Sequence, residues 1–265
     1  MIDLKIENPA ATGEIFDSHA HYDDAKFDGV RDELITAQPR YGVGGVINCA
    51  IDLEKSAAAN KELCRKYDFF YAAYGIHPEC VGEENPFDEE KLRELLSDEK
   101  AVAVGEIGLD YHWGSDNKAA QIACFGDQLR LARELDMPAI IHDREAHGDT
   151  FKLLSEIKPR GVVHCFSGSD ELARQLTALG FYIGIGGVAT FKNAKKLVSV
   201  IENLPLERLL LETDAPYMSP EPLRGTLNCS AYICFTAEKI AAIKGVSRET
   251  VLAASRENIK TLFGV

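Results

Sequence analysis

Short apolar stretches alternate with longer amphipathic stretches along this chain. There are eight of the short stretches, and most of them are continuous apolar runs, the pattern expected of strands that are covered on both faces. They predict β-strands over residues 14–17, 45–49, 69–75, 101–106, 139–142, 161–165, 181–186 and 209–212. The apolar runs are too short to cross a membrane as a helix.

The segments between these strands have helical periodicity. They predict helices over residues 54–67, 89–97, 119–135, 148–157, 171–179 and 194–202, and two more over 230–244 and 247–263 after the eighth strand. Asp88 and Ser247 are expected N-caps, and Gly180 is an expected C-terminal stop.

Eight strand–helix units in 265 residues predict an α/β fold, namely a TIM-type (β/α)₈ barrel formed by residues 1–265 as a single domain. A doubly wound open sheet is the alternative. No Gly-x-Gly-x-x-Gly motif follows a strand, which argues against a dinucleotide-binding version of that sheet.

Composition and charge narrow the function classes. Apolar residues make up 46% of the chain and charged residues 27%, as in ordinary globular proteins. The seven cysteines form no Cys-x-x-Cys pair, and the N-terminus does not read as a secretory signal, so we expect a cytoplasmic protein. The net charge of −13 argues against a long nucleic-acid footprint. It does not exclude a phosphate bound at a metal centre.

Polar residues occupy the ends of the predicted strands. Asp17, His19 and His21 alternate along the first strand, so their side chains are expected to point the same way, with the imidazoles roughly 6–7 Å apart. Two such imidazoles can converge on one metal ion. Taken alone, this motif is equally consistent with a surface turn that happens to carry two histidines.

Four other strands end in the same manner, on Glu106, His142, His164 and Asp214. A charged or imidazole group directly after an apolar strand costs free energy unless something pairs with it. The C-terminal ends of barrel strands also form the active-site face. The five strands together therefore predict a metal site at that face. Glu212 precedes Asp214 and is expected to lie deeper, paired with a neighbouring barrel side chain.

Seven short motifs carry a more specific resemblance. In chain order they read FDSHAH, YGIHPE, GEIGLDY, IIHDREA, HCFSG, ETDAPY and LRG, and they span residues 16–225. Together they resemble the TatD family of metal-dependent deoxyribonucleases, which implies the barrel fold and two divalent ions.

The resemblance also implies a role for each matching residue. His19 and His21 would bind one metal, and Glu106 would bridge both. His142 and His164 would bind the second metal, while Asp214 would touch the first and accept a proton from the attacking water. His77 and Arg224 would contact the substrate near its phosphate.

The chain departs from the family pattern at two positions. Glu79 stands where a second histidine is common, and the proline usual shortly after Asn228 is missing. Both positions are expected to border the substrate cleft, so they concern substrate choice. His112 and His147 are expected to be solvent-facing loop histidines, with a third, weaker ion as the alternative. Trp113 and Tyr111 either stack on a base or cover the barrel rim.

The sequence thus predicts a metal-dependent hydrolase that uses two divalent ions, of which Zn, Mn and Mg are the candidates. The resemblance favours a deoxyribonuclease, a 3′-to-5′ exonuclease acting on DNA ends. We expect the protein to be a monomer without membrane attachment. A hydrolase of a small phosphodiester, a cyclic amide or a lactone is the alternative. A non-catalytic metal-binding scaffold is disfavoured because every expected ligand is present.

Overall fold

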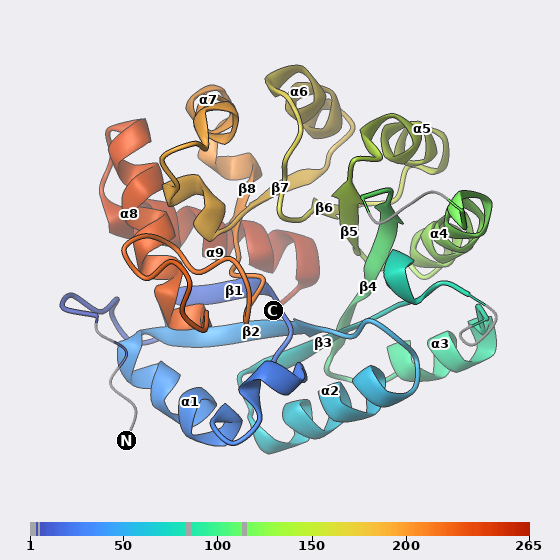
Figure 1. Cartoon of the computed structure of the whole chain (residues 1–265), viewed down its shortest axis with the longest axis horizontal. Helices are drawn as coiled ribbons and strands as arrows, with labels where there is room; N and C mark the ends of the chain where they lie inside the picture. Colours follow the sequence, from blue (N-terminus) through green and yellow to red (C-terminus); the bar gives the residue numbers. More distant parts are fainter. Residues whose placement is uncertain (1–3, 5, 83–85, 113–115) are drawn as a thin grey trace.

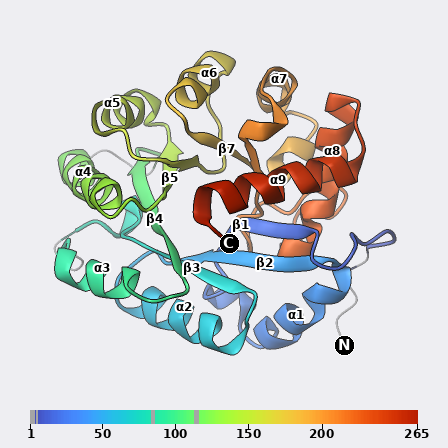
Figure 2. The ribbon, with the colours of Figure 1, turned by 180° about the vertical axis from the view of Figure 1, so that it is seen from behind.

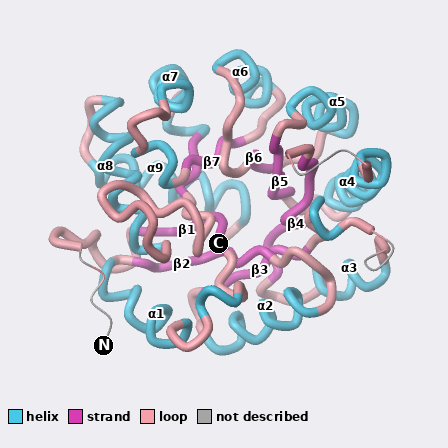
Figure 3. Tube along the Cα trace, viewed as in Figure 1, coloured by secondary structure: helices cyan, strands magenta, loops and turns pink. Residues whose placement is uncertain are grey.

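The computed structural model describes residue 4 and residues 6–82, 86–112 and 116–265. Its strands form one parallel sheet in which each strand pairs with the next in chain order. Helices surround this sheet, so that the strands lie in the middle of the molecule (Figure 1, Figure 3). The strands are β1 (Ile15–Ala20), β2 (Val43–Cys49), β3 (Phe70–Tyr74), β4 (Ala101–Asp110), β5 (Ala139–Arg144), β6 (Gly161–Val163), β7 (Tyr182–Ile185) and β8 (Leu209–Leu211).

The helices follow the strands in alternation, as the sequence predicted. They are α1 (Arg31–Ala37), α2 (Lys55–Lys66), α3 (Glu89–Leu96), α4 (Lys118–Glu134), α5 (His147–Ile157), α6 (Asp170–Ala178), α7 (Lys195–Asn203), α8 (Ile233–Lys244) and α9 (Arg248–Phe263). Among the described residues, no helix is both long and apolar enough to cross a membrane.

The sheet closes on itself between β1 and β8. Ala20 and Ala215 form a parallel bridge just beyond the end of β8. The backbone N–H of His21 donates to the carbonyl of Ala215 at 2.7 Å, and that of Asp214 donates to the carbonyl of His19 at 3.0 Å. The (β/α)₈ barrel is therefore confirmed, and the open sheet is excluded.

Helix α9 covers the end of the barrel at which the strands begin. Figure 2 shows it lying across the sheet on that side. Its residues Ile259, Leu262 and Phe263 pack against barrel residues such as Ala103 and Ile140. Because this end is covered, the opposite end, where the strands finish, is left for a functional site.

Local signals in the sequence are confirmed where the structure tests them. The Asp88 side chain accepts a hydrogen bond from Lys91 N at 3.0 Å, and the Ser247 side chain accepts one from Thr250 N at 3.1 Å. Gly180 follows α6 with φ +98°, a conformation that residues other than glycine rarely adopt.

Three elements differ from the prediction. Strand β1 runs on to Ala20, whereas the predicted strand ended at Asp17. Strand β4 continues beyond Glu106 to Asp110, because Gly108 and Asp110 are buried inside the barrel as Glu106 is. The short helix α1 was missed, since its seven residues give too little periodicity to recognise. Its Leu34 and Ile35 are nevertheless buried. All seven cysteines are free, and five of them are buried.

Candidate metal centre

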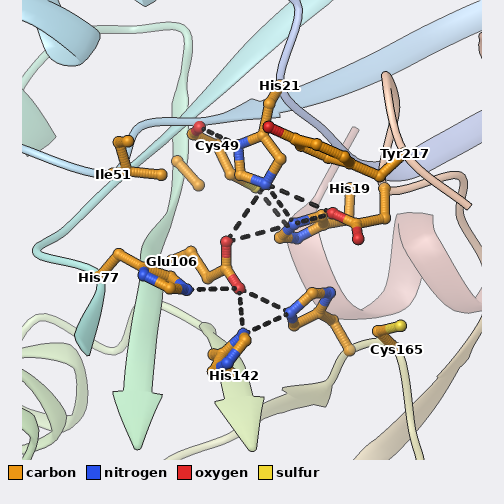
Figure 4. Close-up of polar contacts among 12 residues, drawn as sticks. His19, His21, Cys49, Ile51, His77, Glu106, His142, Cys165 and Tyr217 are labelled. Carbon is orange, nitrogen blue, oxygen red and sulfur yellow. Dashed lines mark hydrogen bonds and ion pairs between the residues drawn. The ribbon is translucent and has the colours of Figure 1, made fainter. Parts of the chain in front are cut away.

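The predicted ligands converge on one carboxylate at the open end of the barrel. Figure 4 shows His19, His21, His77 and His142 around Glu106. Glu106 comes from within β4 and is 2% exposed. The five strand ends that were predicted to share a site therefore do so in space.

One oxygen of Glu106, Oε2, belongs to a first ligand set. We define this set as Glu106 Oε2, His19 Nε2, His21 Nε2 and Asp214 Oδ1. The two imidazole nitrogens are 3.0 Å apart. Glu106 Oε2 lies 3.4 Å from His19 and 3.3 Å from His21, and Asp214 Oδ1 lies 3.6 and 3.5 Å from the same nitrogens. A tetrahedral ion with bonds of about 2.1 Å holds its ligand atoms roughly 3.4 Å apart. The spacing of the first ligand set fits such an ion.

The other oxygen of Glu106, Oε1, belongs to a second ligand set, which we define as Glu106 Oε1, His142 Nδ1 and His164 Nε2. Oε1 lies 2.9 Å from His142 and 2.6 Å from His164, and the two nitrogens are 3.4 Å apart. His77 Nε2 lies 3.6 Å from the same oxygen. His77, predicted to contact substrate, is thus also within reach of an ion at this second ligand set.

Both carboxylates of the cluster are ionised at neutral pH. Burial would raise the pKa of Glu106, but the surrounding histidines, His164 and His19 foremost, hold it well below its usual range. Burial would also raise the pKa of Asp214, but a hydrogen bond with His21 and the charge of His19 outweigh it and lower this pKa below its usual value. Ionised carboxylates and imidazole nitrogens form the donor set that Zn²⁺ and Mn²⁺ prefer, and an ion would displace any proton held on the coordinating nitrogens.

Several candidate ligands are oriented by contacts behind them. His142 Nε2 lies 2.9 Å from Asp110 Oδ2, and His21 Nδ1 lies 2.9 Å from the carbonyl of Cys49. Burial lowers the pKa of His142, but the contacts with Asp110 and Glu106 outweigh it and raise that pKa to about 10. A carboxylate behind a metal-binding histidine selects its tautomer and orientation.

The sequence reasoning missed Asp110. Its position at the end of the GEIGLDY motif, four residues after Glu106, was the available signal. Residues four apart on a strand share a face, so both carboxylates point into the barrel.

Asp17 and Glu212 lie beside the cluster but have other partners. Asp17 accepts hydrogen bonds from the backbone N–H and hydroxyl of Thr213 at 3.0 and 2.6 Å, which ties β1 to the segment that carries Asp214. Glu212 accepts a hydrogen bond from the backbone N–H of Cys165. The expected side-chain partner of Glu212 is present only at 3.9 Å, as His164 Nδ1. Burial raises the pKa of Glu212 to about 8.

The remaining predicted substrate contacts fall in different places. His77 is 8% exposed and borders a cavity of about 780 Å³ above the cluster. Arg224 is not among the described residues that line this cavity, and its guanidinium lies 4.4 Å from the ring centroid of Phe191. Glu79 does line the cavity, as expected for a residue that borders the cleft.

Two histidines outside the cluster have carboxylate partners. His112 Nδ1 lies 2.7 Å from Glu145, and His147 Nδ1 lies 2.8 Å from Asp143. Neither belongs to a ligand-capable group among the described residues. Tyr111 donates a hydrogen bond to Asp149 at 2.9 Å. Trp113 lies outside the described residues, so its predicted stacking role has no structural counterpart here.

Comparisons with known proteins match nearly the whole chain. The family described as TatD related DNase matches residues 16–264. A metal-dependent hydrolase of Bacillus subtilis, YabD, is 39% identical over 254 residues, which cover 95% of this chain and 99% of that protein. The 3′-5′ ssDNA/RNA exonuclease TatD of Escherichia fergusonii is 34% identical over 259 residues, which cover 95% of this chain and 99% of that protein.

A solved structure extends the agreement to three dimensions. The TatD homologue YjjV from Escherichia coli K12 superposes with a TM-score of 0.88 at 33% identity, over 96% of this chain and 99% of that one. The hydrolase TatD family protein of Entamoeba histolytica has a TM-score of 0.84 at 24% identity, with the same coverage, and supports the fold alone.

Proposed function

The chain belongs to the TatD-related DNase family of metal-dependent hydrolases, and on that premise we propose that it is a two-metal phosphodiesterase acting on DNA ends. The activity proposed is that of a 3′-to-5′ exonuclease. The relative in Escherichia fergusonii carries that description, which supports the choice of nucleic acid over other esters.

The division of Glu106 between the two ligand sets is the observation that carries this proposal. One oxygen faces His19 and His21, and the other faces His142 and His164, at distances of 2.6–3.4 Å. A carboxylate placed in this way can bridge two ions. Such a pair forms the usual clamp for phosphoryl hydrolysis in nucleases and phosphatases.

The chain itself would supply binding, orientation and proton transfer. Two divalent ions held by the first and second ligand sets would neutralise charge on the phosphoryl oxygens and acidify water. Asp214, ionised and 18% exposed in its side chain, would accept the proton of the attacking water. Water adds to phosphorus, the bond between phosphorus and the sugar oxygen breaks, and that oxygen takes up a proton. His77 lies at the cavity wall, in position to donate to a phosphate oxygen.

A small phosphodiester, cyclic amide or lactone is the second candidate substrate. Two observations favour it: the net charge of −13, and a cavity of about 780 Å³ whose lining includes the apolar side chains of Phe166, Val188 and Leu197. A pocket of that size matches a small ligand.

Labelled oligonucleotides separate the two candidates. Single strands labelled at the 3′ or the 5′ end are incubated with protein loaded with Zn²⁺, Mn²⁺ or Mg²⁺, and bis(p-nitrophenyl) phosphate is assayed alongside. The proposal predicts release of the 3′ label in the first cleavage and a ladder of progressively shorter products that keep the 5′ label, both absent in an Asp214→Asn control. Turnover of the small diester without any shortening of oligonucleotides would reject the nuclease in favour of the second candidate.

A further inference from the structure

The walls of the cavity above the metal centre differ in charge. On the side of β1 to β3 the lining includes Asp23, Asp24 and Glu79, and on the side of β5 to β7 it includes Arg144 and Lys196. These two groups of strands lie on opposite sides of the barrel (Figure 1). A ligand held at the metal centre therefore meets carboxylates in one direction and cationic side chains in the other.

The carboxylates of the acidic wall differ in whether the protein already engages them. Asp23 accepts hydrogen bonds from Asn48 and Ser56, at 3.0 and 2.5 Å. Asp24 accepts one from the hydroxyl of Tyr217 at 2.6 Å. The backbone N–H of Glu79 donates to His77 Nδ1 at 3.2 Å, but its carboxylate makes no hydrogen bond or ion pair with the part of the chain that the structure describes. Glu79 is thus the acidic-wall carboxylate with its acceptor capacity left for a ligand.

Tyr217 lines the same cavity as Glu79 and the metal-centre residues His21 and Asp214. It follows Asp214 by three residues and is drawn with the metal-centre residues in Figure 4. Burial, the hydrogen bond with Asp24 and the charges of Asp24, Asp214 and Glu79 all raise the pKa of its hydroxyl. The phenol therefore stays protonated and donates its hydrogen bond to Asp24. The amine of Lys26 lies 3.8 Å from the ring centroid of Tyr217 but is not among the described residues that line the cavity.

We propose that Glu79 is a specificity-determining residue that accepts a hydrogen bond from the free 3′-hydroxyl of the terminal nucleotide. This inference rests on the proposed exonuclease activity. A carboxylate accepts an O–H from a sugar but repels a phosphate in the same place, as in dinucleotide-binding proteins where an acidic residue bonds the ribose 2′-hydroxyl. The acidic wall thus receives a chain end and rejects a continuing strand.

The opposite wall suits the rest of the strand. Arg144 is exposed at the end of β5, and Lys196 lies in the first turn of α7, where its amine donates to the carbonyl of Ser167 at 3.1 Å. Asp143 on the same side is paired with His147. A second phosphate, one nucleotide away from the scissile one, would find cationic partners here and none among the lining residues of the acidic wall.

The test compares two single-stranded oligonucleotides that differ only at the terminus, a 3′-hydroxyl in one and a 3′-phosphate in the other. The metal-loaded wild-type protein should hydrolyse the hydroxyl form with a kcat/KM about tenfold or more above that of the phosphate form, the scale of one hydrogen bond to a charged acceptor. Glu79→Gln should remove most of this preference, and Glu79→Lys should reverse it.

Binding supplies a readout that does not depend on turnover. In an Asp214→Asn background, fluorescence anisotropy should give the same order of Kd for the two oligonucleotides and the same loss of preference on adding Glu79→Gln. Glu156 on α5 is an exposed glutamate outside the cavity lining, so Glu156→Gln and Glu156→Lys make the matching charge changes as controls. They should leave the preference unchanged.

The outcomes separate the two proposals. Hydrolysis of both oligonucleotides at equal rates, or a preference that survives Glu79→Lys, overturns the role of Glu79 and leaves the nuclease intact. A preference that shifts equally in the Glu156 variants also overturns it, because general charge would then be the cause. Failure to hydrolyse any oligonucleotide rejects the nuclease and the role of Glu79 together.

Discussion

Replacing Asp110 by asparagine tests the support behind the second ligand set. In the wild type, Asp110 Oδ2 lies 2.9 Å from His142 Nε2, and Asp110 Oδ1 accepts the backbone N–H of His112 at 2.9 Å. Both oxygens thus act as acceptors, so on metal binding His142 would keep its proton on Nε2 and give up the one on Nδ1, which leaves Nδ1 for an ion.

Asparagine cannot reproduce this pattern in either orientation. If its amide group faces His142, two donors meet unless the imidazole moves its proton to Nδ1, the atom that faces Glu106. If the amide group faces the other way, it meets the N–H of His112. One hydrogen bond involving a charged group is lost, which costs roughly 1.5–3 kcal/mol. That corresponds to about 10–150-fold in affinity and agrees with the 10–100-fold typical of such partners.

The assay is competition for metal against a chromophoric chelator. Asp110→Asn should weaken the second equivalent of metal by that factor and leave the first nearly unchanged, since His19 and His21 do not contact Asp110. Asp143→Asn is the matched control, because Asp143 is a buried β5 carboxylate that pairs with His147. Two equivalents held by Asp110→Asn with wild-type affinity would refute the tautomer argument.

Four further predictions follow from the site and its charge. Asp214→Asn should lower kcat by about 10²–10⁴-fold with both ions retained; near-normal turnover would place the proton acceptor elsewhere. Glu106→Ala should release both ions in elemental analysis, and two retained equivalents would contradict bridging. The hydrogen bond with Asp143 raises the pKa of His147, so the NMR titration midpoint of His147 should lie above 6.5. The stability that this pair contributes should be complete below pH 6.5 and should be lost as the pH rises through the pKa of His147 in the folded protein. An unchanged titration of His147 in Asp143→Asn would exclude the hydrogen bond as the cause. The logarithm of the binding constant for single-stranded DNA should fall only slowly with the logarithm of the salt concentration, with a slope of roughly −1.4 for two phosphate contacts. A slope of roughly −4 would indicate six phosphate contacts and contradict this prediction.

Much of the fold was predictable because its signals are local. Continuous apolar runs marked most of the eight strands, and side chains such as Asp88 and Ser247 marked helix starts through hydrogen bonds spanning three residues. The predictions went wrong where local pattern and burial disagree. Strand β4 was ended too early at Glu106, because carboxylates and glycines read as a loop when their barrel surroundings are unknown.

The candidate ligands were predictable for a related reason. Chain position relative to a strand end, together with residue type, selected His19, His142 and Asp214. The barrel brings every strand end to the same face. The position of a residue at a strand end does not specify which of its side-chain atoms contacts each neighbouring residue.

By itself, the sequence determined the barrel, the ligand types and the face on which they gather, since these follow from periodicity and residue chemistry. Only the tertiary structure decided how Glu106 divides its oxygens, that Asp110 stands behind His142, that Arg224 lies over Phe191 and that the cavity walls differ in charge. The physical reason is distance along the chain. These contacts join residues from separate elements, and their geometry depends on the register and closure of the whole barrel, which no local pattern encodes.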